Sequence, residues 1–141
     1  MIEVAGLTKS YGDKQVVRGV DFEVAEGEIF GILGPNGAGK TTTVECIGGL
    51  RMRDGGRVRV AGFDPAAQER GLRESLGIQL QESRLPDKQT VGEAMRLYAG
   101  FYSHPRDWRE LLDRLGMRGH ERTSFARLSG GQKQRLSVAL A

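Results

Sequence analysis

Three stretches of the chain alternate between apolar and polar side chains. They cover residues 2–8, 16–25 and 57–61, and in each the apolar positions recur at about every second residue. Alternation with a period of two places the apolar side chains on one face of a strand. The pattern therefore predicts three half-buried strands of an antiparallel sheet.

Two further stretches are short and mostly apolar. Residues 29–33 read Ile-Phe-Gly-Ile-Leu, and residues 76–80 read Leu-Gly-Ile-Gln-Leu. Runs of this kind are typical of strands that are buried on both faces of a parallel sheet. We expect both to be core strands.

Capping residues and apolar residues at helical spacing predict the helices. One helix is expected over residues 41–48 and a shorter one over residues 66–74. Thr90 and Glu93 fit a capping box, and the helix behind it carries an apolar stripe formed by Val91, Ala94, Met95, Tyr98, Ala99 and Tyr102. A further helix is expected after Pro105, with Gly116 as its stop; its apolar face consists of Trp108, Leu111, Leu112 and Leu115.

Length and composition limit the class of protein. A chain of 141 residues, of which 38% are hydrophobic, suits one domain of common size. No apolar run approaches the ~20 residues of a membrane span, and the first residues lack the basic and then apolar pattern of a secretory signal. The single cysteine, Cys46, allows no disulfide framework. We therefore expect a cytosolic protein without direct membrane insertion.

The net charge of +3 arises from 21 basic and 18 acidic residues that are spread along the chain. Binding to nucleic acid favours a clustered basic stripe with aromatic side chains on which bases stack. Since the few aromatic residues are scattered, the composition disfavours nucleic acid as a partner. A modest basic excess instead favours an anionic nucleotide.

The most specific pattern is a glycine loop, residues 34–41, between the strand and the helix expected on either side. It matches G-x-x-x-x-G-K-[ST], the phosphate-binding loop, at each fixed position. The loop consists of Gly34, Pro35, Asn36, Gly37, Ala38, Gly39, Lys40 and Thr41. Its glycines let backbone N–H groups turn toward a polyphosphate, and the following helix adds the positive end of its dipole.

Three side chains complete this expected nucleotide site. Lys40 would place its charge over the β- and γ-phosphates, the Thr41 hydroxyl would ligate Mg²⁺, and Thr42 would donate to a phosphate oxygen. The alternative is a glycine-rich turn that binds nothing. The match at every fixed position, in a strand–loop–helix context, argues against that alternative.

A second glycine-containing segment, residues 128–135, reads Leu-Ser-Gly-Gly-Gln-Lys-Gln-Arg. Ser129 can cap a helix, and Gly130 and Gly131 would expose backbone amides at its positive end. Alone, this segment fits a plain capped turn better than a phosphate-binding helix start.

Together the two motifs resemble the ATP-binding cassette (ABC) family, whose signature is L-S-G-G-Q; residues 128–135 are called the signature segment below. The resemblance runs over all 141 residues, because the intermediate features come in the family's order. It implies an α/β fold: a P-loop NTPase (RecA-like) core with an antiparallel β subdomain and a helical insert. We expect the β subdomain and core in residues 1–82, the helical subdomain in residues 83–127, and the signature motif with the start of its helix in residues 128–141.

The resemblance also assigns site residues and the cofactors ATP and Mg²⁺. Tyr11 lies where the family has an aromatic that stacks on adenine, and Gln81 where it has a glutamine that contacts Mg²⁺ or the attacking water; Gln79 is the alternative. Family cassettes stack head to tail, so the signature would contact ATP in the glycine loop of a second cassette through Ser129, Gly130, Gly131 and Gln132. The reaction is expected to depend on Lys40, Thr41 and Gln81.

One part of the family pattern does not occur in the 141 residues. The family continues into an apolar strand ending in Asp-Glu and a switch histidine, and no apolar run here ends in Asp-Glu. His104 and His120 are not placed to substitute, and both are expected at the surface. We therefore expect an incomplete cassette that lacks the later core strands, leaves apolar sheet surface uncovered, and does not hydrolyse ATP alone.

These features predict the ATP-binding subunit of an ABC transporter, of exporter type, that couples MgATP binding and hydrolysis to transport. Its partners would be a separate transmembrane permease and a second cassette, at the cytoplasmic face of the cell membrane. Two alternatives stay open: a half-cassette that binds nucleotide without turnover, and a soluble ABC ATPase outside transport. The short helical insert without heptads argues against the latter.

Overall fold

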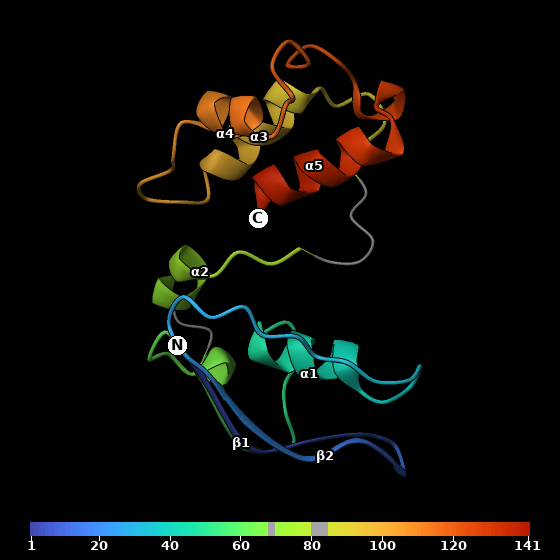
Figure 1. Cartoon of the computed structure of the whole chain (residues 1–141), viewed down its shortest axis with the longest axis vertical. Coiled ribbons are helices and arrows are strands. Elements are labelled where there is room, and N and C mark those ends of the chain that lie inside the picture. The colour runs from blue at the N-terminus through green and yellow to red at the C-terminus, as the bar shows by residue number, and fades with distance from the viewer. Residues whose placement is uncertain (68–69, 80–84) are drawn as a thin grey trace. The chain divides into compact units, whose positions relative to one another are not determined.

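The computed structural model describes residues 1–67, 70–79 and 85–141. The chain divides into two compact units, Met1–Leu76 and Gly77–Ala141 (Figure 1). We call them the N-terminal unit and the C-terminal unit. Within the described ranges, no helix is both long and apolar enough to cross a membrane.

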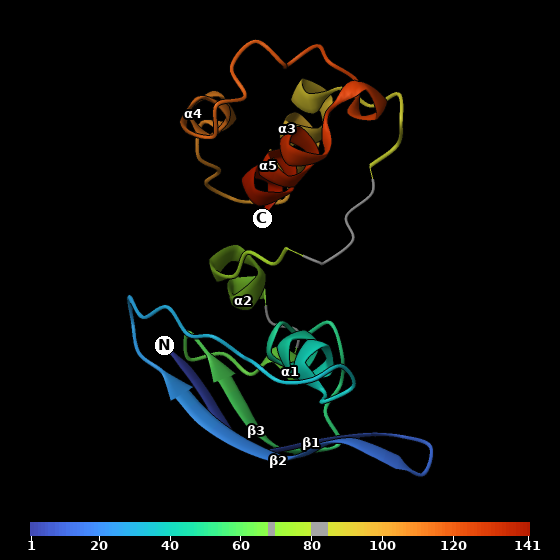
Figure 2. The same ribbon diagram turned by 45° about the vertical axis from the view of Figure 1, so that its right-hand side comes forward.

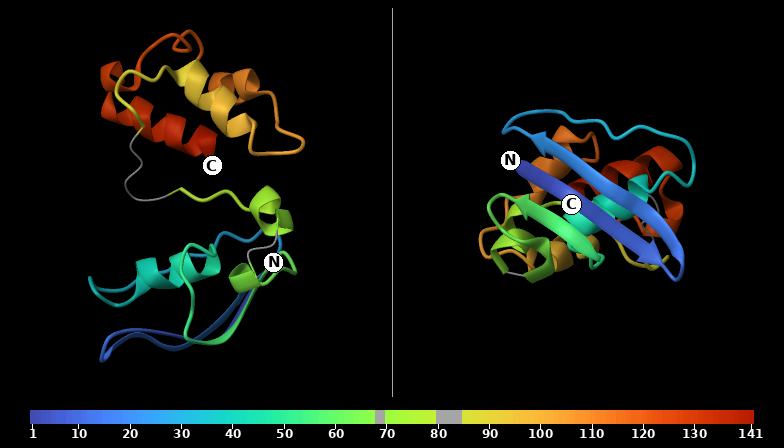
Figure 3. Two further views of the ribbon diagram at one scale, coloured as in Figure 1. Left: turned by 180° about the vertical axis from the view of Figure 1, so that it is seen from behind. Right: turned by 90° about the horizontal axis from the view of Figure 1, so that it is seen from below.

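A three-stranded sheet forms one layer of the N-terminal unit. β1 (Ile2–Tyr11) is central and pairs with β2 (Lys14–Val24) on one side and β3 (Gly55–Val60) on the other, so the order is β2-β1-β3 (Figure 3, right). Both pairings are antiparallel. The three strands predicted from the alternating stretches are confirmed.

α1 (Lys40–Ile47) covers one face of this sheet, and η1 (Pro65–Ala67) and α2 (Arg70–Ser75) follow β3 (Figure 2). The buried core consists of Val4, Leu7, Val17, Cys46, Ile47, Val58, Val60 and Leu72. Burial raises the pKa of the Cys46 thiol, so this cysteine serves packing rather than thiolate chemistry. Each fully buried aliphatic side chain contributes about 1.5–3 kcal/mol, and this packing fixes α1 and hence the loop that precedes it.

The prediction of a core strand at residues 29–33 is wrong. This segment is irregular, and Ile29 and Leu33 are 99% and 93% exposed. A parallel strand is stabilised by hydrogen bonds to its neighbours and by helices on both faces, and the described ranges place no strand beside it. Residues 76–79 likewise form no strand, and Leu80 lies outside the described residues.

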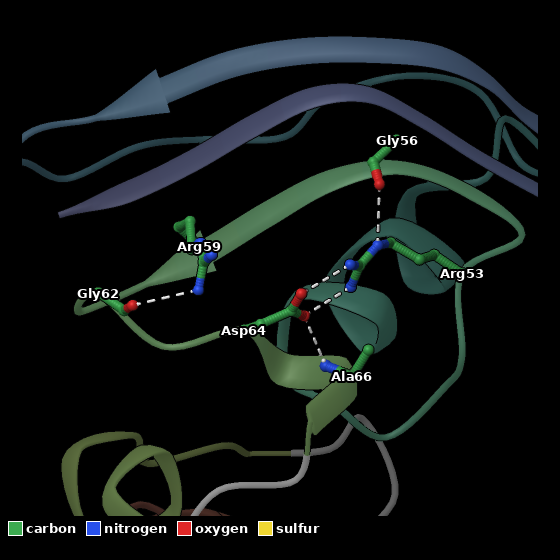
Figure 4. A network of polar contacts seen from close by, with 6 residues as sticks. All are labelled: Arg53, Gly56, Arg59, Gly62, Asp64 and Ala66. Atoms are coloured by element: carbon green, nitrogen blue, oxygen red, sulfur yellow. Dashed lines mark hydrogen bonds and ion pairs between the residues drawn. The ribbon is translucent and has the colours of Figure 1, made fainter.

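An ion pair fastens the segment after α1 to the start of η1 (Figure 4). The Arg53 guanidinium donates to both carboxylate oxygens of Asp64 at 2.8 Å and to the carbonyl oxygen of Gly56 at 3.1 Å. Asp64 also accepts from the Ala66 N–H at 2.9 Å. The pKa of Asp64 is lowered from 3.8 to about 2, chiefly by the hydrogen bond from Arg53 and further by that from the Ala66 N–H.

This ion pair predicts a pH dependence of stability. Because folding depresses the Asp64 pKa from 3.8 to about 2, the stabilisation is fully present above about pH 5 and is lost progressively as the pH falls through about 2. One pKa unit corresponds to about 1.4 kcal/mol, and solvent screening of this partly exposed pair reduces the stabilisation to about 1 kcal/mol. We expect Asp64→Asn to lower the free energy of unfolding in urea at pH 6. At pH 2 the variant and the wild type should be nearly equal; a constant difference between pH 6 and pH 2 would contradict the assignment.

The C-terminal unit is helical. α3 (Val91–Ala99), α4 (Trp108–Arg114), η2 (Phe125–Arg127) and α5 (Gly130–Leu140) surround a core of Val91, Met95, Leu112, Met117, Phe125, Leu128 and Leu136. Thr90 caps α3 through the predicted capping box with Glu93. The apolar stripe is confirmed on α3, although this helix ends before Tyr102.

Candidate nucleotide-binding site

The glycine loop leads directly into α1 and crosses close to the sheet. Gly37 and Gly39 have left-handed backbones, with φ of 81° and 86°. Gly39 is the N-cap of α1, and a Cβ on it would lie 2.6 Å from the carbonyl oxygen of Val16 in β2. Glycine at position 39 is therefore required both by the backbone angle and by the approach of the loop to the sheet.

No side chain caps the start of α1. In contrast, α3, α4 and α5 are capped by Thr90, Asp107 and Ser129, whose side chains accept from backbone N–H groups. The first amides of a helix have no acceptor within the helix. An uncapped start thus leaves these donors, and the positive end of the helix dipole, available to an anion. Residues 34–38 are exposed, so an anion can reach them from solvent.

The Lys40 ammonium group lies against the glycine loop. Its Nζ donates to the carbonyl oxygens of Gly34 at 2.7 Å and Pro35 at 2.8 Å, which holds a positive charge beside the exposed backbone. In the first turn of α1, Thr41 is exposed and Thr42 is half-buried. Backbone amides, an ammonium and an accessible hydroxyl fit a polyphosphate together with an oxygen-seeking cation such as Mg²⁺.

Two clefts flank the loop. The first, of about 380 Å³, is lined by residues 14–18 and 20 of β2 and by Gly37 and Ala38. The second, of about 350 Å³, extends from Lys40 to the rings of Phe22 and Phe30, which stack with centroids 4.9 Å apart. Both volumes are in the range of about 300–1,000 Å³ that is usual for small-molecule sites. Both clefts offer positive charge to an anionic ligand, because Lys14 and Arg18 line the first and Lys40 lines the second.

Tyr11, the expected base-stacking residue, lies at the turn end of β1 and is 43% exposed. The Arg51 guanidinium lies 5.3 Å from the centroid of the Tyr11 ring, and the Lys9 ammonium lies 5.8 Å from it. Arg51 Nε also donates to the Glu45 carboxylate on α1 at 2.6 Å. These contacts link the aromatic ring to the loop helix. The sequence does not predict these contacts, because the residues that form them are not related by a regular helical or strand spacing.

The signature segment forms the start of α5. The Ser129 hydroxyl accepts from the Gln132 N–H at 3.3 Å, and the Gln132 side-chain oxygen accepts from the Ser129 N–H at 2.9 Å, so the predicted cap is confirmed. Gly130 and Gly131 are exposed, and a Cβ on either would meet no atom within 4 Å. The local fold therefore does not require glycine at these two positions. Glycine even destabilises a helix by about 0.5–1 kcal/mol relative to alanine.

His120 is half-buried, contrary to the expectation of a surface residue. Its Nε2 lies 3.2 Å from the side-chain nitrogen of Gln132. Arg135 of α5 donates to the carbonyl oxygen of Leu115 at 3.1 Å. These contacts join positions that are 12 and 20 residues apart, so no local pattern predicts them.

The predicted site residues thus fall into two groups. The glycine loop, Thr42 and Tyr11 lie in the N-terminal unit, and Ser129–Gln132 lie in the C-terminal unit. Gln81 lies outside the described residues, so its role stays a prediction. Gln79, its alternative, is exposed and belongs to no strand.

Comparison with known proteins decides the family. A family profile described as ABC transporter matches residues 17–141, which include the glycine loop and the signature segment. The chain belongs to the ABC transporter family. The resemblance carried by the two motifs is therefore confirmed.

Curated ABC relatives match the chain over almost its whole length. "Nod factor export ATP-binding protein I" of Rhizobium sp. (strain N33) is 38% identical over 145 residues, covering 99% of this chain and 48% of the relative. "Linearmycin resistance ATP-binding protein LnrL" of Bacillus subtilis (strain 168) is 32% identical over 146 residues, covering 100% and 47%. The chain spans about half the length of the curated relatives it matches.

A solved structure of the ATP-binding subunit of an ABC transporter is similar to this chain, with a TM-score of 0.87 at 28% sequence identity. The match covers 99% of this chain and 60% of the solved one. This similarity confirms the predicted fold class. The described residues form the antiparallel sheet of that fold but not its parallel core strands.

Proposed function

We propose that this chain is part of the ATP-binding subunit of an ABC transporter, and that the intact subunit couples MgATP binding and hydrolysis to transport through a separate transmembrane permease. We place it at the cytoplasmic face of the cell membrane. The names of the relatives, which refer to Nod factor export and linearmycin resistance, support an exporter.

The observation that carries this proposal is the uncapped start of α1 beside a fixed ammonium group. The helix offers amide donors without a side-chain acceptor, and Lys40 is held within hydrogen-bonding distance of the same loop. Unmet donors and a nearby positive charge favour a multiply charged anion. The triphosphate of ATP has the charge and the length to engage the loop backbone and Lys40 together.

The other residues would act on the two ends of the nucleotide. Tyr11 would stack on the base, a contact that contributes about 1–3 kcal/mol. Thr41, with Gln81, would hold Mg²⁺, and Thr42 would donate to a phosphate oxygen. Bound Mg²⁺ supplies neutralisation of the phosphate charge. Lys40 would hold the terminal phosphate in place, since positioning and electrostatics account for most catalysis of phosphoryl transfer.

The signature segment would act on a second copy of the cassette. Gly130 and Gly131 expose backbone amides at the start of α5 and leave open space above them. Glycines that the fold does not require are explained by the close approach of another group. We propose that this group is the terminal phosphate of ATP bound to the partner cassette, so that ATP holds the dimer together.

Binding, association and phosphate release separate this proposal from its alternatives. Calorimetric titration of the 141-residue chain should show MgATP binding, and sedimentation velocity should show association only with MgATP. Phosphate release should stay at the background level for this chain alone, in keeping with the prediction that it is hydrolysis-deficient. Absence of MgATP binding in a folded chain would refute the proposed function. Turnover that depends on Lys40 would instead refute the predicted deficiency.

A substitution at Gly131 tests the signature surface. Gly131→Glu should fold normally, because its Cβ meets open space, but its carboxylate would repel the approaching phosphate. We expect MgATP-dependent association to weaken at least tenfold, measured by sedimentation. Gly131→Gln has the same shape without the charge and is the control. Equal behaviour of the two variants would show that no phosphate approaches this surface.

A further inference from the structure

We infer that His120 is a positioning residue of the signature segment: its imidazole accepts a hydrogen bond from the Gln132 amide and so holds the start of α5 in one arrangement. The contact joins His120 Nε2 to Gln132 Nε2 at 3.2 Å and is partly buried. No short-range pattern in the sequence contains it, since the two residues are 12 positions apart.

The other hydrogen bonds of Gln132 determine the donor and the acceptor in its contact with His120. Its side-chain oxygen accepts from the Ser129 N–H at 2.9 Å, so the amide nitrogen must face His120. Turning the amide over would set a nitrogen donor against the Ser129 N–H. An amide nitrogen only donates, so His120 Nε2 must carry its lone pair toward Gln132. The ring is therefore neutral, with its proton on Nδ1.

The backbone around His120 is fastened to the helical core on both sides. The His120 N–H donates to the Met117 carbonyl oxygen at 3.2 Å, and its own carbonyl oxygen accepts from the Thr123 N–H at 2.8 Å. Two residues of α3 then bond to this loop: the Val91 N–H donates to Thr123, and the Gly92 N–H to Glu121. His120 thus extends from a fixed frame to Gln132.

Fixing Gln132 affects the exposed glycines beside it. The capping box closes around Gly130 and Gly131, because Ser129 precedes them, Gln132 follows them, and the two side chains bond reciprocally. With the His120 contact, Gln132 forms three hydrogen bonds in addition to those of the regular α5 backbone. A defined orientation of the two glycine amides lowers the entropic cost of binding an anion there. This consequence rests on the proposed role of the signature in binding ATP of a second cassette.

Two variants of His120 distinguish hydrogen bonding from packing. His120→Gln can place a carbonyl oxygen near the position of Nε2 and keep the acceptor, whereas His120→Phe keeps a ring of similar size and removes it. The exposed His104 supplies a matched control, His104→Phe. A packing role predicts that phenylalanine substitutes better than glutamine; a positioning role predicts the reverse.

The first measurement is ¹⁵N NMR of the whole 141-residue chain. We expect His120 Nε2 to be unprotonated and Nδ1 to carry the proton. The Gln132 side-chain amide and the Ser129 N–H should shift in His120→Phe and stay near their wild-type positions in His120→Gln. A proton on Nε2 in the wild type, or no change at Gln132 in His120→Phe, would overturn the inference.

The second measurement is MgATP-dependent association by sedimentation velocity. His120→Phe should weaken association about five- to tenfold, as expected for one lost hydrogen bond, and His120→Gln should restore most of it. Wild-type association in His120→Phe would overturn the functional part. If the wild-type chain does not associate with MgATP, the proposed dimer fails, while the NMR result still decides whether His120 positions Gln132.

Discussion

Replacing Lys40 by alanine is expected to weaken MgATP binding by about 100-fold or more. The ammonium group lies 2.7 and 2.8 Å from two carbonyl oxygens of the glycine loop, so its charge is already in place before a nucleotide binds. Charge-assisted hydrogen bonds contribute about 1.5–3 kcal/mol each, and 1.4 kcal/mol corresponds to a factor of ten in affinity. Two such bonds to phosphate oxygens account for the expected loss. Titration with a fluorescent ATP analogue measures it.

Lys88→Ala is the control for this experiment, because Lys88 is an exposed lysine of the C-terminal unit. It should bind the analogue with wild-type affinity. The Lys40 ammonium also bonds to the loop itself, so circular dichroism must show that the Lys40→Ala variant is folded. Unchanged affinity in a folded Lys40→Ala variant would remove the glycine loop from its proposed role.

The sequence predicts best those elements whose residues contact near neighbours. The antiparallel strands and the capping box of Thr90 and Glu93 were predicted because a period of two, or a spacing of three, is set by local geometry. The segment 29–33 shows the limit of this reasoning. Its apolar composition suits a buried strand, but burial depends on partners, and among the described residues none pairs with it.

The candidate site likewise has parts that depend on neighbouring residues and parts that depend on contacts between distant positions. The glycine loop and the signature segment are contiguous motifs, so their residues could be named from the sequence, and the structure places each at a helix start. The contact of Arg51 with Tyr11 and that of His120 with Gln132 could not be predicted. Each forms only when the packing of the unit brings distant positions together. In the proposed site these two contacts would position Tyr11 and Gln132, whereas the glycine loop and the signature segment would supply the groups that bind the phosphates.

Gly37, Gly39, Gly130 and Gly131 separate into two kinds by what a Cβ would meet. A Cβ on Gly130, Gly131 or Gly37 would meet open space, and of these three only Gly37 has a left-handed backbone. Gly39 instead faces the Val16 carbonyl oxygen of β2. At this position the glycine holds the loop close to the sheet, and the fold and the site depend on it together.

We therefore expect Gly39→Ala to destabilise the N-terminal unit by about 2–5 kcal/mol. A left-handed backbone costs a residue with a Cβ about 1–2 kcal/mol, and a Cβ 2.6 Å from the Val16 oxygen forces the loop or β2 to move, which adds about 1–3 kcal/mol. Amide hydrogen exchange of β1 and β2 measures the loss as faster opening of the sheet. MgATP affinity should fall as well, because the shift displaces the start of α1.

Gly37→Ala is the matched comparison for stability. Its φ of 81° is close to the 86° of Gly39, but its Cβ would meet no atom within 4 Å, so it bears the backbone strain without the collision. We expect it to lose only about 1–2 kcal/mol. Equal losses in the two variants, measured without nucleotide, would mean that the approach of the loop to Val16 does not hold the sheet and the glycine loop together.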